Sequence, residues 1–266
     1  MEKLKAKWME MNLYRRVLLA VMLAEIFGFF FAAILCVNRP GLEYGGTLLY
    51  PRAEVEFQIY EGKLDGEPAR FTVSPEGEVA YQWGEYSYGP WQVTVNSAAF
   101  PETLGDHDGT HNIGLEIRRG DEVLFRGGYR PGSTLSLYAE DGEPLWNVNS
   151  YATTTDGTTI EGNGREISQV ELHEPALSAV ARVVLAPELT HRGSLLLWFG
   201  VTLIALLNIF QLCLPGFFFR LSLWGHVRNI DDAEPADWYI AMEHIEWAAL
   251  SVICLVLYWQ ALRVIV

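Results

Sequence analysis

Three long apolar runs stand out from an otherwise polar chain: Val17–Val37, Leu195–Leu214 and about Tyr239–Leu262. A helix needs about 20 apolar residues to cross the roughly 30 Å of hydrocarbon in a bilayer, and each run is long enough. The pattern predicts three transmembrane helices, at residues 17–37, 194–214 and 238–262. Between the last two lies a loop, residues 215–237, whose aromatic part is typical of a segment at the membrane surface.

A different pattern fills residues 38–193. Apolar and polar positions alternate over short stretches, as at Trp91, Val93 and Val95, and turn sequences such as Asp65-Gly66 separate them. Alternation with a period of two is typical of half-buried strands, and Asp-Gly suits a tight hairpin turn. We therefore expect a membrane-anchored all-β fold, with three transmembrane helices and an extracytoplasmic antiparallel β-sandwich or jelly-roll-like domain. Residues 175–186 fit either a short helix or a last strand.

Charge orients the chain across the membrane. Five basic residues precede the first apolar run: Lys3, Lys5, Lys7, Arg15 and Arg16. An excess of Lys and Arg is typical of the cytoplasmic side. The run is longer than the about 7–15 apolar residues of a signal peptide, so we expect an anchor that is not cleaved. Residues 1–16 and 215–237 then lie in the cytoplasm, and residues 38–193 and 263–266 lie outside.

Almost all of the net charge lies in residues 38–193. That segment holds 24 Asp and Glu against 11 Lys and Arg, so it carries −13 of the −14 of the whole chain. Such an acidic domain argues against nucleic acid as a partner, because phosphate backbones are also negative. The three cysteines, Cys36, Cys213 and Cys254, lie in the apolar runs, so we expect the domain to be stable without disulfides.

Polar residues inside the apolar runs form a predicted intramembrane cluster. It consists of Glu25, Asn208, Gln211, Glu243, His244 and Glu246. If Trp238-Tyr239 and Tyr258-Trp259 mark the two membrane surfaces, Glu246 lies about 12 Å inside the cytoplasmic edge. By the same arithmetic Glu25 lies about 13 Å inside. We expect Glu25 to face protein, and to be protonated, paired with His244, or hydrogen-bonded to Asn208 or Gln211.

Two other interpretations of this cluster are open. The third helix could instead cross at residues 247–266, which would leave Glu243, His244 and Glu246 among the lipid headgroups. Alternatively, the polar groups only hold the helices together. In the first run, a stripe of small residues, Ala20, Ala24, Gly28 and Ala32, favours close approach of another helix, from this chain, a second copy or another membrane protein.

Two groups of residues outside the apolar runs are candidate binding sites. Asp106, Asp108 and His111 could hold a divalent cation, although Asp, Gly, Thr and Asn in this stretch also suit a plain turn. Trp83, Tyr86, Tyr88 and Trp91 could stack on a glycan, although sheet proteins use aromatic residues mainly for packing. We find no nucleotide-binding, hydrolase or zinc-protease motif, so no catalytic residue is predicted and no cofactor beyond that cation.

The last quarter of the chain resembles a known group of proteins. HRGSLLLWFG (191–200), PGFFFRLSLW (215–224) and EPADWYIAMEHIEW (234–247) are similar to the C-terminal helix pair of an uncharacterised group of bacterial multi-pass membrane proteins. The resemblance covers about residues 191–266 and implies a bacterial membrane protein. We expect a protein that displays a domain outside the membrane to bind a protein, a glycan or a cation. The alternative is a small membrane component of a transport or assembly complex that uses the intramembrane polar residues.

Overall fold

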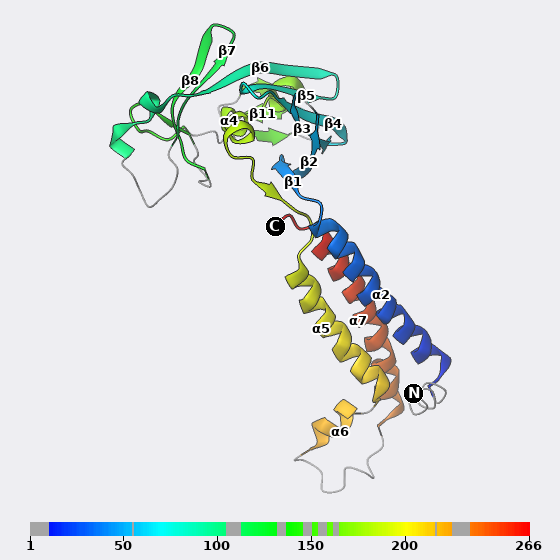
Figure 1. Ribbon diagram of the computed structural model, residues 1–266. Helices are drawn as coiled ribbons and strands as arrows, with labels where there is room; N and C mark the ends of the chain where they lie inside the picture. Colours follow the sequence, from blue (N-terminus) through cyan, green and yellow to red (C-terminus); the bar gives the residue numbers. More distant parts are fainter. Residues whose placement is uncertain are drawn as a thin grey trace. The chain divides into compact units, whose positions relative to one another are not determined.

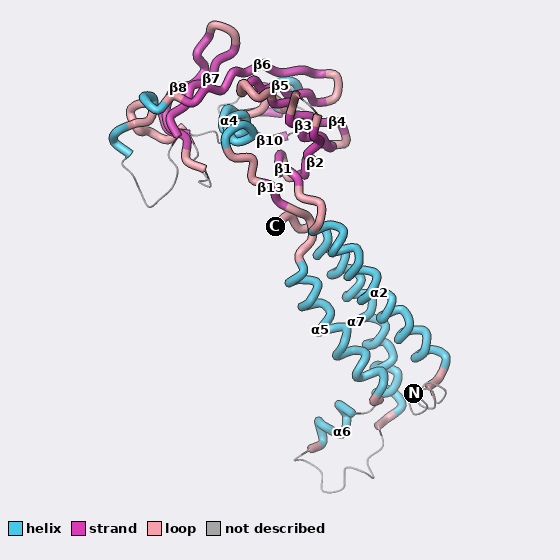
Figure 2. The backbone as a smooth tube through the Cα atoms, in the orientation of Figure 1, coloured by secondary structure: helices cyan, strands magenta, loops and turns pink. Residues whose placement is uncertain are grey.

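The chain folds into two compact units. The computed structural model describes residues 11–54, 56–104, 113–131, 137–145, 151–153, 159–161, 165–215, 217–224 and 235–266. Met1–Arg39 and His191–Val266 together form one unit, which we call the helical unit. Pro40–Thr190 form the other, which we call the β unit. Figures 1 and 2 show helices in the first and mainly strands in the second.

Three helices in the described part of the helical unit are long and apolar enough to cross a membrane: α2 (Leu13–Val37), α5 (Leu195–Cys213) and α7 (Asp237–Arg263). The short helix α6 (Phe217–Leu223) lies between α5 and α7 in the chain. Side chains cap two of the long helices. Asn12 Oδ1 accepts from the backbone N–H of Arg15, and Ser194 Oγ accepts from that of Leu197. Such caps satisfy N–H groups that have no partner inside the helix.

The three long helices pack side by side, as Figure 1 shows. Their shared interior includes the buried apolar side chains Met22, Ile26, Val201, Ala205, Cys254 and Tyr258. Their outward faces expose large apolar residues such as Phe31, Leu196 and Val252. An exposed apolar surface of this extent is unusual for a soluble monomer and matches a lipid environment.

The β unit is built on a large antiparallel sheet, as expected. The described strands are β1 (Gly41–Tyr44), β2 (Thr47–Ala53), β3 (Gln58–Leu64), β4 (Glu67–Val73), β5 (Glu78–Trp83), β6 (Tyr86–Val95), β7 (Ile113–Arg119), β8 (Glu122–Tyr129), β9 (Leu137–Ala139), β10 (Tyr151–Thr153), β11 (Thr159–Glu161), β12 (Glu166–Ile167) and β13 (Leu189–Thr190). Two 3-10 turns, η1 (Ser97–Ala99) and η2 (Glu102–Leu104), follow β6.

Ten of these strands form one sheet in the order β13-β1-β2-β3-β4-β5-β6-β7-β8-β9, and β10, β11 and β12 form a smaller one. The architecture is compatible with a β-sandwich. From β1 to β9, however, each strand pairs with its neighbour in the chain, which is the order of a meander. A jelly roll would instead bring together strands that are distant in sequence, and the described strands show one such pair, β1 with β13.

A helix completes the core of the β unit. Residues 175–186, which fit either a helix or a strand by sequence, contain α4 (Leu177–Leu185). Val180, Ala181 and Val183 are buried in the same apolar cluster as Phe71, Trp91 and other side chains of the sheet. Leu177, Val180, Ala181 and Val184 recur at the spacing of one helical face, so a helix buries them together, whereas a strand would separate them.

Two substitutions at α4 test its packing in the core, because we expect one to lower and the other to raise the free energy of unfolding. Val180→Ala removes two buried methyl groups, so we expect a loss of roughly 1.5–3 kcal/mol in the free energy of unfolding. Ala176 is the N-cap residue and makes no side-chain cap. Ala176→Ser should therefore stabilise the protein by about 0.5–1 kcal/mol. Urea unfolding of the detergent-solubilised chain, followed by near-ultraviolet circular dichroism, measures both. Equal effects of the two substitutions would contradict this packing.

Candidate functional site

A strip of polar side chains lies inside the bundle of long helices. Glu25 of α2 is 9% exposed, Asn208 of α5 is 0% exposed, and Thr202 of α5 and Ser251 of α7 are also buried. The surrounding interior is apolar. Buried polar groups in such surroundings are costly unless they find hydrogen-bond partners, so their contacts decide how the helices are oriented.

The strip links α7 to both other helices. Ser251 Oγ donates to Glu25 Oε1 at 3.4 Å, which joins α7 to α2. Asn208 Nδ2 donates to the backbone oxygen of Trp247 at 3.0 Å and approaches the sulfur of Met22 at 3.5 Å. A second link between α5 and α7 is the hydroxyl pair Thr202 and Tyr258, 2.9 Å apart. The polar strip therefore holds the helices together as well as being a candidate site.

Three acceptor oxygens of the strip and its surroundings have no hydrogen-bond partner among the described residues. They are Glu25 Oε2, Asn208 Oδ1 and Gln211 Oε1, and all three atoms are buried. An unsatisfied buried polar atom costs about 1–3 kcal/mol, so native proteins keep few of them. Unpartnered acceptors near the middle of an apolar bundle are typical of positions that take up a proton, a water or an ion.

The other predicted cluster residues lie at one end of the bundle. The Tyr14 hydroxyl donates to the backbone oxygen of His244 at 2.6 Å, and the Arg15 guanidinium lies 5.9 Å from the Trp247 ring centroid. Tyr14 is 11 residues before Glu25, or about 16 Å along the helix. The structure thus places His244 at the charged start of α2, away from Glu25.

Glu243 and Glu246 belong to the same end. They are half-buried and exposed, respectively, and neither has a contact described with Glu25. Gln211 is half-buried, and among the described residues no hydrogen bond joins it to Asn208 or Glu25. Sequence reasoning missed Ser251, which contacts Glu25 where His244 was expected, and Thr202, which pairs with Tyr258. The sequence feature that could have identified both residues is a hydroxyl side chain within an apolar run.

The stripe of small residues in α2 does not form the packed face of that helix. Ala20, Ala24 and Gly28 are exposed, and a Cβ atom built on Gly28 would have no neighbour within 4 Å. The face that packs against the other helices carries Met22 and Glu25 instead. The stripe is therefore available to a second copy or to another membrane protein.

The four candidate stacking aromatics of the β unit divide between core and surface. Trp91 and Tyr88 are buried in the core, so packing accounts for them. Trp83 is half-buried, and its indole N–H donates to the backbone oxygen of Leu64 at 3.1 Å. Tyr86 is exposed and stacks on Trp83, with ring centroids 6.0 Å apart. Only Tyr86 and the edge of Trp83 remain for a ligand.

Trp83 has a second ring partner, His173, which sequence reasoning missed. The two rings are parallel within 8°, with centroids 3.5 Å apart, and His173 is only 7% exposed. Its Nδ1 lies 2.8 Å from the Gln169 backbone oxygen and its Nε2 lies 3.2 Å from Asp65 Oδ2. Both partners accept hydrogen bonds, so both nitrogens can donate only when the ring is protonated. A protonated ring would also gain a cation–π contact with Trp83.

Local structure holds these partners in position. Asp65 occupies the positive-φ position of the β3–β4 hairpin turn, with φ of 53°, followed by Gly66 at 89°. On the other side, helix α3 (Gln169–Leu172) begins with a capping box between Ser168 and Glu171. The hydrogen bond from the Ser168 backbone N–H, followed by the charge of Arg165, lowers the pKa of Glu171. The segment before His173 is therefore well anchored.

Tyr88 adds a further anchor. Its hydroxyl donates to the backbone oxygen of Val170 at 2.7 Å, which ties α3 to strand β6. Burial raises the pKa of Tyr88. Together with the Asp65–His173 contact, this bond fixes the stacked rings of His173 and Trp83 in the β unit.

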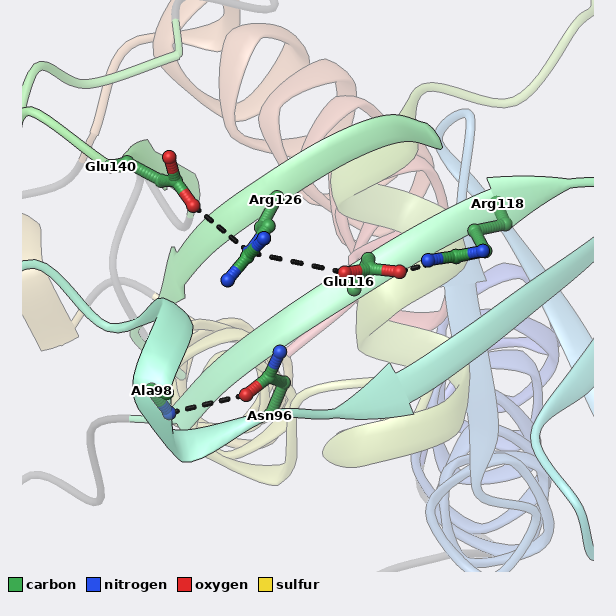
Figure 3. A network of polar contacts seen from close by, with 6 residues as sticks. All are labelled: Asn96, Ala98, Glu116, Arg118, Arg126 and Glu140. Atoms are coloured by element: carbon green, nitrogen blue, oxygen red, sulfur yellow. Dashed lines mark hydrogen bonds and ion pairs between the residues drawn. The ribbon is translucent and has the colours of Figure 1, made fainter. Parts of the chain in front are cut away.

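A charged network covers strands β7 and β8 (Figure 3). Glu116 accepts a close hydrogen bond from Arg118, and its other oxygen lies 3.9 Å from Arg126 Nε. Arg126 also pairs with Glu140 at 2.9 Å. Nearby, Asn96 Oδ1 caps η1 through the backbone N–H of Ala98, 3.2 Å away. The Arg126–Glu140 pair is exposed, and exposed ion pairs contribute only about 0–1 kcal/mol each, so this pair adds little stability.

The predicted cation ligands Asp106, Asp108 and His111 lie outside the described residues. Within the described ranges, no group of three or more His, Cys, Asp or Glu side chains could hold a metal ion. The cation site therefore stays a prediction of the sequence.

Comparison with known proteins gives no relative: no protein-family model matches the chain, and neither a curated protein nor a solved structure is significantly similar to it. The function must therefore be argued from the residues and contacts described above.

Two alanine substitutions in α5 test the polar strip. Asn208→Ala loses the bond to Trp247 and leaves a cavity at a fully buried position, so we expect a loss of about 1–2 kcal/mol in the stability of the bundle. Gln211→Ala removes an amide with an unpartnered oxygen, so its cost should stay within about 0.5 kcal/mol. Thermal unfolding in detergent micelles compares them. A larger cost for Gln211→Ala than for Asn208→Ala would show that the strip is assigned wrongly.

The His173 stack makes a separate prediction. His173→Phe keeps a flat ring against Trp83 but loses both polar contacts, so we expect a loss of about 1–3 kcal/mol. Tyr86→Ala removes an exposed ring and should cost within about 0.5 kcal/mol. Hydrogen exchange of residues 165–173, measured by mass spectrometry, should rise in the first variant and stay unchanged in the second. Equal protection in both variants would rule out the stack as the anchor of α3.

Proposed function

We propose that the chain is an integral protein of a bacterial cell membrane, in which α2, α5 and α7 cross the bilayer. The apolar outward faces of the helices, with a polar strip between them, support this proposal. The basic residues before α2, among them Arg15 and Arg16, favour a cytoplasmic N-terminus. The β unit and the C-terminus then lie outside, and the loop that contains α6 lies in the cytoplasm.

In this proposal the β unit, a β-sandwich-like domain, recognises a protein partner. The observation that carries it is the charged face of β7 and β8, where the exposed residues Arg126 and Glu140 form a network with the half-buried Glu116. A net charge of −13 over residues 38–193 favours a basic surface on the partner. A glycan ligand has less support, because Trp91 and Tyr88 belong to the core. A cation ligand rests on the sequence of residues 106–111 alone.

A second function has its own support. The unpartnered Oε2 of Glu25 and the exposed stripe of Ala20, Ala24 and Gly28 favour a small membrane component of a transport or assembly complex. In that case the stripe would contact another helix and Glu25 would handle a proton or an ion. Glu25→Gln would then abolish the phenotype of the complex while leaving the bundle folded.

One labelling experiment tests sidedness and recognition together. In a variant with Cys36, Cys213 and Cys254 replaced by serine, we place single cysteines at Arg126, Glu76 or Lys5. A membrane-impermeant maleimide that carries a photo-crosslinker should label the first two positions in intact cells, because both lie in exposed parts of the β unit. It should label the third only after permeabilisation.

On illumination, the label at residue 126 should capture a protein, whereas the label at residue 76, on the turn between β4 and β5, serves as the control. Labelling of residue 5 from outside would overturn the proposed orientation. Equal capture from both β-unit positions would overturn recognition through the β7–β8 face.

A further inference from the structure

A cavity of about 260 Å³ lies at the Arg15 end of the helical unit. The start of α2, the helix α6 and the first turns of α7 contribute to its wall. The side chains that matter for its chemistry are Arg15, Arg220, Glu243, His244 and Trp247. Trp247 alone of these residues also contacts the polar strip, through its backbone oxygen.

The cavity is rich in hydrogen-bond donors. Trp247 is only 1% exposed, yet its indole nitrogen is buried without a hydrogen-bond partner. Arg15 donates through Nε and Nη2 to the backbone oxygen of Leu212, which fixes its guanidinium over the Trp247 ring. Arg220 is exposed, and no described residue pairs with it. Two guanidinium groups and a buried N–H in one cavity favour an anion with several acceptor oxygens, such as a phosphate.

Glu243 is the carboxylate in this lining, and it opposes an anion. Among the described lining residues, two arginines stand against this one carboxylate, which leaves an excess of positive charge. His244 would add a further donor.

A second, apolar groove adjoins the cavity. It measures about 750 Å³, runs along α7 past Ile245, Ala249 and Val252, and shares Asn12 and His244 with the cavity. A polar cavity that continues into an apolar groove fits a molecule with an anionic head and a hydrocarbon tail. A free phosphate would leave the groove empty.

We propose that the cavity binds the phosphate of an anionic phospholipid and that one acyl chain lies in the groove along α7. This inference rests on the proposed insertion of α2, α5 and α7 in the membrane. In that orientation the cavity faces the inner leaflet, where basic residues attract anionic headgroups. α6, with Phe217, Leu221 and Trp224 exposed, would then lie against the same leaflet.

The test uses the full chain in a neutral detergent and follows thermal unfolding during titration with phosphatidylglycerol, phosphatidylcholine or inorganic phosphate. We expect phosphatidylglycerol to raise the unfolding temperature in a saturable manner and the other two to leave it nearly unchanged. Arg220→Gln should weaken the apparent affinity for phosphatidylglycerol about fivefold, the effect of about 1 kcal/mol per interfacial arginine. Among the described residues Arg220 has no partner that the substitution would disturb, unlike Arg15, which also donates to Leu212 of α5.

Of two further variants, one is a control and the other tests the groove separately from the cavity. Arg263→Gln, at the other end of α7, is the matched control and should bind like the wild type. Val252→Trp fills the groove and should weaken binding of the lipid. An equal response to phosphatidylcholine, or an unchanged affinity in Arg220→Gln, would overturn the proposal. A response to inorganic phosphate as large as that to the lipid would make the cavity a site for free anions instead. Failure of membrane insertion itself would appear in the cysteine labelling, which involves no added lipid.

Discussion

Polar groups buried in an apolar helix bundle are costly unless they find hydrogen-bond partners within the protein. The arrangement of α2, α5 and α7 follows from this constraint. Glu25 turns toward Ser251, and Asn208 turns toward the backbone of Trp247. Each contact fixes the rotation of two helices about their axes, and the remaining faces are left to apolar side chains that suit lipid.

The helices themselves could be predicted from the sequence, because the length and apolarity of a span are local properties. Their rotation and depth could not. The stripe that ends at Ala32 suggested one packed face of α2, but the polar partners of Glu25 select another. The aromatic pairs at the ends of α7 suggested that Glu246 lies level with Glu25, whereas the residue of α7 that contacts Glu25 is Ser251, five positions further on. Such registers depend on pairs of residues from separate helices.

In the β unit, too, some features could be predicted from the sequence and others could not. Turns such as Asp65-Gly66 could be predicted because their chemistry is contained in a few adjacent residues. The choice between core and surface for Trp91 and Tyr86 could not, because alternation gives two faces without saying which one is buried. The contact between His173 and Asp65 joins residues 108 positions apart. Only the folded sheet brings these two together.

The meander order of the large sheet also determines how the β unit can assemble. From β1 to β9 each strand needs only the strand before it in the chain, so pairing can proceed hairpin by hairpin as the polypeptide is made. The pairing of β1 with β13 is different, because it joins the two ends of the unit. That step must wait until α4 has been made. A chain made from its N-terminus can therefore add its strands one after another and form the β1–β13 pair last. Few unpaired strand edges are then exposed during synthesis.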